Sequence, residues 1–163
     1  MRTSYVIAFG SNQRHPRFGA PEHVIAAAIS ALNGAPVSVI TSAPIIKSRP
    51  LGPSQRCYAN SAALISTSLP PPELLAYLHA IERAFGRRKC GQRWRARVLD
   101  LDIILWEGGI WESRELVVPH PHFRSRKFVL TPLRAIVPLW RDPIRHLSTQ
   151  HLHARLDRAR RRA

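Results

Sequence analysis

Apolar residues recur along this chain with two spacings, which alternate from one segment to the next. Short apolar runs and strict alternation predict strands, whereas apolar residues three and four positions apart predict one face of a helix. Strands are therefore expected over residues 5–9, 37–47, 58–67 and 98–106. Helices are expected after the first and the third of these strands, one opened by Pro21 and closed by Gly34, the other opened at Pro70 and closed by Gly86.

The predicted order of elements, β-α-β-β-α-β, is typical of the ferredoxin-like α+β fold. A chain of 163 residues is long enough for one domain with a substantial core. We therefore expect a single domain over 1–163, with a core over about 4–140 and a C-terminal extension. A short helix is expected at about 131–136, and the region after 141, with its basic tail at about 153–163, is either a surface helix or frayed.

The last predicted strand carries the most informative pattern. Within 98–106, aliphatic residues alternate with Asp100 and Asp102, so a strand puts the aliphatic side chains on one face and both carboxylates on the other, whereas a helix would separate the carboxylates. On one strand face their Cα atoms lie about 7 Å apart, close enough for both side chains to converge on a hard cation. The aliphatic residues expected on the opposite face are Leu99, Leu101, Ile103 and Leu105.

The charge of the chain points to anionic ligands. The sequence has 25 Lys and Arg against 10 Asp and Glu, a net charge of +15, which favours nucleotides, nucleic acid or acidic surfaces as partners. Six of these cations lie within 87–97, directly before the acidic strand. A magnesium–nucleotide complex requires such a combination, because the metal binds oxygen and the phosphates bind guanidinium groups. No apolar stretch suits a signal peptide or a membrane span, so we expect a cytoplasmic protein without a membrane partner.

Six short motifs, in order between about residues 4 and 140, resemble those of the 6-hydroxymethyl-7,8-dihydropterin pyrophosphokinase family. The motifs are Phe9-Gly10-Ser11-Asn12, Arg49-Pro50-Leu51-Gly52-Pro53, Tyr58-Ala59-Asn60, Gly86-Arg87, Arg93-Trp94 with Arg97-Val98-Leu99-Asp100-Leu101-Asp102-Ile103, and Val118-Pro119-His120-Pro121. The resemblance implies a ferredoxin-like fold. It also implies transfer of pyrophosphate from ATP to the hydroxymethyl group of a reduced pterin, with release of AMP, in folate biosynthesis.

The resemblance implies roles on the nucleotide side of a site. Asp100 and Asp102 would hold two Mg²⁺ ions that bridge the ATP phosphates, and one ion would also lower the pKa of the pterin hydroxyl. Arg87, Arg97 and His120 match catalytic positions that contact the phosphates. Other nucleotide-side positions are matched by Glu82, Lys89, Ile103 and Arg126. For Glu82, a salt bridge with an arginine of the 87–97 loop stays an equal alternative.

On the pterin side, the resemblance implies aromatic faces around a flat ring and an amide that reads its edge. The aromatic positions are matched by Tyr58, Trp94 and Phe128, the amide by Asn60, and two loop positions that line the pocket by Ser48 and Leu51. The chain departs from the family pattern at Arg49, at Lys89 and at Arg95-Ala96. The aspartates and His120 are retained, so we expect an active monomer whose loops at 50–55 and 87–97 close over ATP and pterin.

Two other functions stay open from the residues alone. An RNA-binding ferredoxin-like module would suit the topology and the charge, but such modules carry paired aromatic residues, and only residues 126–129 resemble a fragment of that pattern. A catalytically weak paralogue would suit the altered loop at 87–97. We predict the pyrophosphokinase, with ATP and a reduced pterin as substrates and no nucleic-acid partner.

Overall fold

The computed structural model describes residues 1–49, 57–86 and 98–162. The secondary structure in chain order is β1 (Thr3–Ser11), α1 (Pro21–Leu32), β2 (Val37–Ser42), β3 (Ile46–Ser48), β4 (Tyr58–Thr67), α2 (Pro71–Ala84), β5 (Asp100–Trp106), β6 (Trp111–Glu112), β7 (Val117–Val118), the 3₁₀ helix η1 (Phe123–Ser125), α3 (Lys127–Ile136) and α4 (Thr149–Arg162). None of the described helices is long and apolar enough to cross a lipid bilayer.

A five-stranded antiparallel sheet forms the centre of the molecule. Its main strands lie in the order β2-β4-β1-β5, and β3 pairs with the N-terminal part of β4. Helix α1 joins β1 to β2 and helix α2 joins β4 to β5, so each helix connects two strands that are not neighbours in the sheet. This is the ferredoxin-like α+β arrangement, and the predicted fold class is confirmed.

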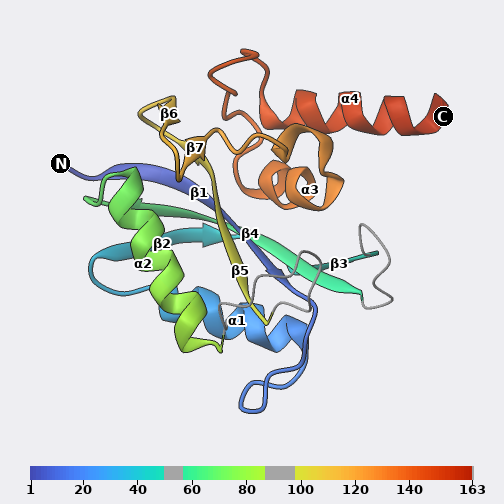
Figure 1. Ribbon diagram of the computed structural model, residues 1–163. Coiled ribbons are helices and arrows are strands. Elements are labelled where there is room, and N and C mark those ends of the chain that lie inside the picture. Colours follow the sequence, from blue (N-terminus) through green and yellow to red (C-terminus); the bar gives the residue numbers. More distant parts are fainter. Residues whose placement is uncertain (50–56, 87–97, 163) are drawn as a thin grey trace.

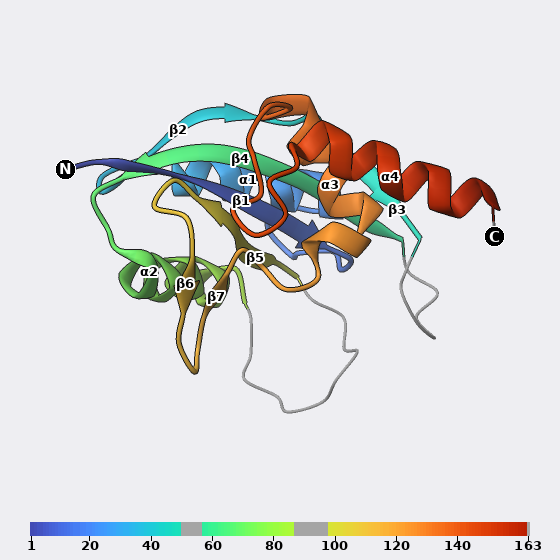
Figure 2. The same ribbon diagram turned by 90° about the horizontal axis from the view of Figure 1, so that it is seen from above.

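Helices cover the two faces of the sheet in pairs. Figures 1 and 2 show α1 and α2 on one side of the strands and α3 and α4 on the other. On the α1/α2 face, fully buried apolar residues of the helices meet those of the strands; they include Ile7, Phe9, Val24, Ile25, Leu74 and Leu78. On the α3/α4 face a smaller apolar cluster is formed; it includes Val6, Ala62, Leu105, Val129, Leu130 and Leu133.

Both predicted helices begin and end where their local sequence favours it. Proline occupies the first turn of α1 and of α2, where its fixed φ suits the helix and a missing N–H costs nothing. Gly86 follows α2 with φ of +88°, a left-handed conformation that favours glycine and ends the helix. The apolar stripes predicted for these helices form the α1/α2 core.

The strand predicted over 37–47 is divided in the structure. It consists of β2 and β3, both paired with β4, with residues 43–45 between them. Pro44 has no N–H to donate to a neighbouring strand, so regular pairing is interrupted there. The single-strand prediction is therefore wrong at these residues, although it assigned both flanking segments to the sheet.

The C-terminal region is more regular than predicted. Helix α3 begins at Lys127, ahead of the expected start at 131, and Pro132 lies inside it. The region after 141 contains α4, which settles the alternative between helix and frayed tail. Leu152 of α4 is buried against the apolar cluster of the α3/α4 face, so this basic helix packs on the domain along one side.

Strand β5 contains an irregularity that its sequence conceals. Val6 pairs with Leu105 and Ile7 pairs with Ile103, so Ile104 is an extra residue opposite β1, and the alternation of side chains shifts by one. Leu99, Leu101 and Ile103 belong to the α1/α2 core, whereas Leu105 belongs to the cluster on the opposite face. The prediction that Leu105 shares the face of the other aliphatic residues is therefore wrong.

Candidate functional site

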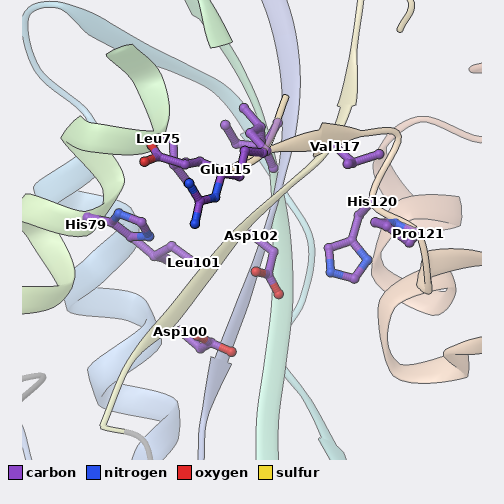
Figure 3. A pocket seen from close by; sticks show the side chains of 12 residues that line it. Leu75, His79, Asp100, Leu101, Asp102, Glu115, Val117, His120 and Pro121 are labelled. Carbon is purple, nitrogen blue, oxygen red and sulfur yellow. The ribbon is translucent and has the colours of Figure 1, made fainter. Parts of the chain in front are cut away.

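Asp100 and Asp102 project together from the first half of β5, ahead of its irregularity. Their partners across the sheet are Gly10 and Ala8 of β1. Ala8 belongs to the apolar cluster of the α3/α4 face, so both carboxylates lie on that face, where they are half-buried. Figure 3 shows the Asp102 carboxylate between Asp100 and the His120 ring. The sequence correctly predicted that the two aspartate side chains share a face.

A second group of polar and aromatic side chains lies on the same face, two strands away from Asp100. Asn60 of β4 pairs with Gly10, which in turn pairs with Asp100. The Asn60 side chain is buried, and its Nδ2 donates a hydrogen bond to Oγ of Ser48 at 2.8 Å. Tyr58 lies two residues before Asn60 and pairs with Ser48, so its half-buried ring projects to this side of the sheet as well.

The start of α3 and the residue before it add an aromatic ring and a cation. Phe128 is partly buried against the apolar cluster of the α3/α4 face. The guanidinium carbon of Arg126 lies 6.0 Å from the centre of the Phe128 ring, within reach of a cation–π interaction. The charge of Arg126 also acts on His120 and lowers its pKa, which puts Arg126, His120 and Phe128 around the same part of the molecule.

His120 is held by backbone contacts on both sides. Its own N–H donates to the carbonyl oxygen of Ile104 at 3.0 Å, which fixes the segment after β7 to β5. The backbone N–H of His122 donates to Nδ1 of His120 at 3.2 Å. Because Nδ1 accepts this hydrogen bond, the neutral ring carries its proton on Nε2, and that N–H is available to a ligand.

The electrostatic surroundings keep the His120 ring neutral. Burial lowers its pKa to about 4, with Arg126 and His122 adding to the effect and Asp100 opposing it. At pH 7 the ring is therefore a neutral hydrogen-bond donor. Phosphate oxygens brought close to Nε2 would favour the charged form and would strengthen this hydrogen bond.

A pocket opens along the edge of β5 that faces away from β1 (Figure 3). It is lined by residues of α2, β5, the segment from β6 to β7 and the loop that follows; they are Leu75, His79, Asp100, Leu101, Asp102, Ile103, Arg114, Glu115, Leu116, Val117, His120 and Pro121. The Leu101 and Ile103 side chains are only 2% exposed. These two residues therefore line the pocket mainly through the backbone edge of the strand.

The strand edge is attached to α2 by a buried carboxylate. The backbone N–H of Leu101 donates to Oε1 of Glu82 at 2.8 Å, and Glu82 is only 1% exposed. Since Leu101 lies between the two aspartates, this hydrogen bond fixes the backbone that carries both. Glu82 thus supports the site through its hydrogen bond to the backbone of β5.

Comparison with known proteins identifies the family. Residues 6–138 match the family described as 7,8-dihydro-6-hydroxymethylpterin-pyrophosphokinase (HPPK). The chain belongs to the HPPK family.

Relatives with known names agree with this assignment. The chain is 40% identical over 144 residues to the 2-amino-4-hydroxy-6-hydroxymethyldihydropteridine pyrophosphokinase of Pseudomonas aeruginosa, with 86% of this chain and 85% of the relative covered. It is 40% identical over 134 residues to the Haemophilus influenzae protein of that name, with coverage of 82% and 80%. A Synechocystis relative of the same name is 45% identical over 97 residues, but this match spans only 49% of its length and 60% of this chain.

The fold recurs in a solved structure of greater length. The Plasmodium falciparum HPPK-DHPS protein in complex with STZ-DHP superposes with a TM-score of 0.74 at 10% identity, over 95% of this chain and 43% of the other. At this identity the likeness concerns the fold. Together with the family match, it confirms the predicted α+β fold, and the family confirms an ATP-dependent pyrophosphokinase of folate biosynthesis over the RNA-binding alternative.

The HPPK motifs account for only part of the pocket. The structure brings together Asp100, Asp102 and His120, with Ile103 at the pocket edge. Asn60, Ser48 and Tyr58 form a neighbouring group across the sheet. Five predicted site residues, namely Leu51, Arg87, Lys89, Trp94 and Arg97, lie outside the described residues, as do the loops over 50–55 and 87–97.

Sequence reasoning missed three polar residues of the pocket. His79 lies three residues before Glu82 on α2, and Figure 3 shows it across the pocket from His120. That spacing puts His79 and Glu82 on neighbouring positions of one helix face, which was a usable signal. Arg114 and Glu115 lie in the short turn between β6 and β7, where no periodicity marks a side chain as facing a ligand.

The donor set suits a divalent cation that arrives with a nucleotide. Asp100 and Asp102 supply carboxylate oxygens, the ligands that Mg²⁺ prefers. Within residues 1–49, 57–86 and 98–162, no group of three or more His, Cys, Asp or Glu side chains is placed to hold a metal ion. Mg²⁺ in nucleotide sites needs only one or two protein carboxylates, because phosphate and water oxygens complete its coordination. The two aspartates therefore fit Mg²⁺ bound together with ATP.

Proposed function

We propose that ATP and the pterin occupy the two neighbouring parts of this site and that the reaction takes place between them. The triphosphate lies along the edge of β5 that faces away from β1, beside Asp100, Asp102 and His120. The pterin lies over β4, beside Tyr58 and Asn60. The observation that carries this division is the strand register, which sets Asn60, Gly10 and Asp100 side by side across three neighbouring strands on one face of the sheet.

Asp100 and Asp102 would hold Mg²⁺ in this arrangement. Two ions bound with ATP would supply Lewis-acid catalysis, since they offset phosphate charge and make the acceptor hydroxyl easier to deprotonate. The chain's own contribution is to fix the two carboxylates, which Glu82 supports through its bond to the Leu101 backbone. The hydroxymethyl oxygen then forms a bond to the β-phosphorus while the bond to the α-phosphate oxygen breaks, and AMP leaves.

His120 and Arg126 are assigned to the phosphates. The neutral His120 ring donates from Nε2, and Arg126 supplies a permanent positive charge close to it. Negative charge spreads over the phosphoryl oxygens in the transition state, so fixed donors in this position stabilise it. Arg87, Lys89 and Arg97 are proposed as further phosphate contacts on the basis of the family motifs.

The pterin is assigned to Asn60 and the surrounding aromatic rings. Asn60 is held by its hydrogen bond to Ser48, so its amide has a fixed direction and can bind the amide edge of the ring. Phe128 and Tyr58 supply apolar faces, with Trp94 and Leu51 proposed from the motifs. Glu82 and Ile103 are proposed to contact the nucleotide, Ile103 through its backbone. A monomeric state and a cytoplasmic location also stay predictions.

A product assay tests the proposal. Purified protein with ATP, Mg²⁺ and 6-hydroxymethyl-7,8-dihydropterin is expected to release AMP and no ADP. The variants Asp100→Asn and Asp102→Asn keep the size of the side chain but remove its charge, so we expect each to lose about a hundredfold or more in kcat with an unchanged circular dichroism spectrum. Full activity in both variants would contradict the metal assignment, and little or no AMP from the wild type would favour the catalytically weak paralogue.

A further inference from the structure

Gly10 lies at the centre of the proposed site. It is in β1, between Asn60 of β4 and Asp100 of β5, and it pairs with both. A Cβ atom built on Gly10 would lie 3.9 Å from Oδ1 of Asn60 and 3.9 Å from Cβ of Asp100. A side chain at this position would therefore stand midway between the residue proposed to read the pterin and the residue proposed to hold Mg²⁺.

The backbone does not require glycine at this position. The φ angle of Gly10 lies outside the left-handed range, unlike those of Gly19, Gly86 and Gly109. Both distances from such a Cβ atom are ordinary van der Waals contacts, so an alanine would meet no steric conflict with the described residues. Glycine inside a central strand is unfavourable, because it loses more conformational freedom on folding than alanine and packs no side chain.

The neighbouring row of paired residues in the sheet has alanine at the position equivalent to Gly10. Two residues earlier on β1, Ala8 lies between Ala62 of β4 and Asp102 of β5. Ala8 and Ala62 belong to the apolar cluster under α3 and α4, so a methyl group is accommodated where the sheet is covered. In the next row, Gly10 lies between Asn60 and Asp100, and no side chain stands between these two residues.

We infer that Gly10 is a positioning residue for the acceptor alcohol. The bare backbone at Gly10 leaves room for the hydroxymethyl arm to cross from the pterin, held beside Asn60, to the β-phosphate, held beside Asp100. Neighbouring strands lie about 4.8 Å apart, so Asn60 and Asp100 are separated by about 10 Å across Gly10, a span that a pterin ring edge and its one-carbon arm can bridge. This inference rests on the proposed function, since it assigns the room above Gly10 to that substrate.

The test compares Gly10→Ala with Gly34→Ala. Gly34 also lies outside the left-handed φ range, and a Cβ there meets nothing within 4 Å among the described residues, so it is a matched control for the change from glycine to alanine. In Gly10→Ala we expect pterin affinity, measured by pterin fluorescence with Mg²⁺ and a non-hydrolysable ATP analogue, to fall roughly tenfold to hundredfold, the effect of forcing one extra methyl into a closely packed contact. Analogue affinity, measured by calorimetry without pterin, is expected to stay within about twofold of the wild type.

Thermal stability separates this role from a structural one. Alanine restricts the unfolded chain more than glycine, so both variants are expected to keep or raise the melting temperature. Loss of pterin affinity together with an undiminished melting temperature supports the inference. Unchanged pterin affinity in Gly10→Ala, or an equal loss in Gly34→Ala, overturns it, and so does a loss that accompanies a lowered melting temperature. The proposed function has a separate outcome, because it fails if the wild type binds both substrates and releases no AMP.

Discussion

The two faces of the central sheet are built from the same strands and differ in how completely they are covered. On the α1/α2 face, helices from two β-α-β units bury an apolar core along the whole sheet. On the α3/α4 face, the apolar cluster is smaller, and beyond it the strands carry Asn60, Asp100 and Asp102. Polar side chains therefore occur where the covering helices end, and the position of α3 decides which strand residues can face a ligand.

The irregularity at Ile104 marks this boundary within one strand. Before it, the α3/α4 side of β5 carries the two aspartates, and after it the same side carries the buried Leu105. The strand edge is fixed before the boundary by Glu82 at Leu101 and at the boundary by the His120 N–H at Ile104. One strand thus contributes polar side chains to the candidate site before Ile104 and a buried apolar side chain to the core after it.

The largest contrast that we expect between the two faces is that truncation of either core lowers stability, whereas only one truncation weakens substrate binding. Ile25 of α1 and Leu133 of α3 are both fully buried, one on each face. Truncation of either to alanine is expected to lower the free energy of unfolding by about 2–5 kcal/mol. Because α3 also carries Phe128, only Leu133→Ala should raise the KM for the pterin as well. Urea unfolding and steady-state kinetics at 15 °C would measure both effects, and an equal rise in KM in Ile25→Ala would show that the faces are not functionally distinct.

A second contrast concerns titration. On the α1/α2 face, burial raises the pKa of Tyr5 to about 12, far from neutral pH. On the α3/α4 face, burial lowers the pKa of His120 from 6.5 to about 4. Between pH 6.5 and about pH 4, the His120 ring binds fewer protons in the folded protein than in the unfolded chain. The contribution of His120 to stability is therefore complete above pH 6.5 and is lost as the pH falls towards 4.

The non-titrating variant His120→Gln isolates this contribution. We expect the wild type to lose on the order of 1–2 kcal/mol more than the variant between pH 7 and pH 4.5, a value reduced from the full shift because part of the ring contacts water. Urea unfolding at both pH values measures the difference, and nuclear magnetic resonance of the ring gives the pKa directly. Parallel losses in the two proteins would mean that folding does not lower the pKa of His120.

The sequence predicted the sheet and the α1/α2 face well because their signals are local. Apolar periodicity, proline at helix starts and Gly86 at a helix end all act within a few residues. The failures lie where packing between distant elements decides the outcome. Leu105 changes faces because Ile104 is an extra residue opposite β1, and it joins the apolar cluster of the α3/α4 face. Helix α3 begins before its expected start because Lys127 and Phe128 pack against other parts of the chain. His79 and Arg114 meet in the pocket only because α2 and the β6–β7 turn flank β5.

The start of α3 depends on an ion pair with α4, which leads to the smallest effect that we predict. Lys127 is the first residue of α3, which has no side-chain cap and no acidic residue in its first turn. A positive charge is unfavourable at this end of the helix dipole. Nζ of Lys127 contacts Oδ1 of Asp157 at 2.6 Å. The other carboxylate oxygen of Asp157 lies 3.3 Å from Nδ1 of His153, and Nε2 of His153 contacts Oγ1 of Thr131 in α3. Asp157 therefore holds the turn from which Arg126 and Phe128 reach the site.

Asp157→Asn removes this charge and is expected to raise the KM for the pterin roughly two- to fivefold, within the range that exposed ion pairs produce, with little change in kcat. Glu22→Gln is a matched control, because Glu22 of α1 pairs with Lys47 at 2.8 Å in a similarly exposed position on the α1/α2 side. Since salt screens such pairs, the difference between wild type and Asp157→Asn should shrink as NaCl is raised from 50 mM to about 1 M, where charges interact over only about 3 Å. If Glu22→Gln raised the KM as much, or if Lys127→Met and Asp157→Asn had additive effects in the double variant, the ion pair would not be what holds α3 over the site.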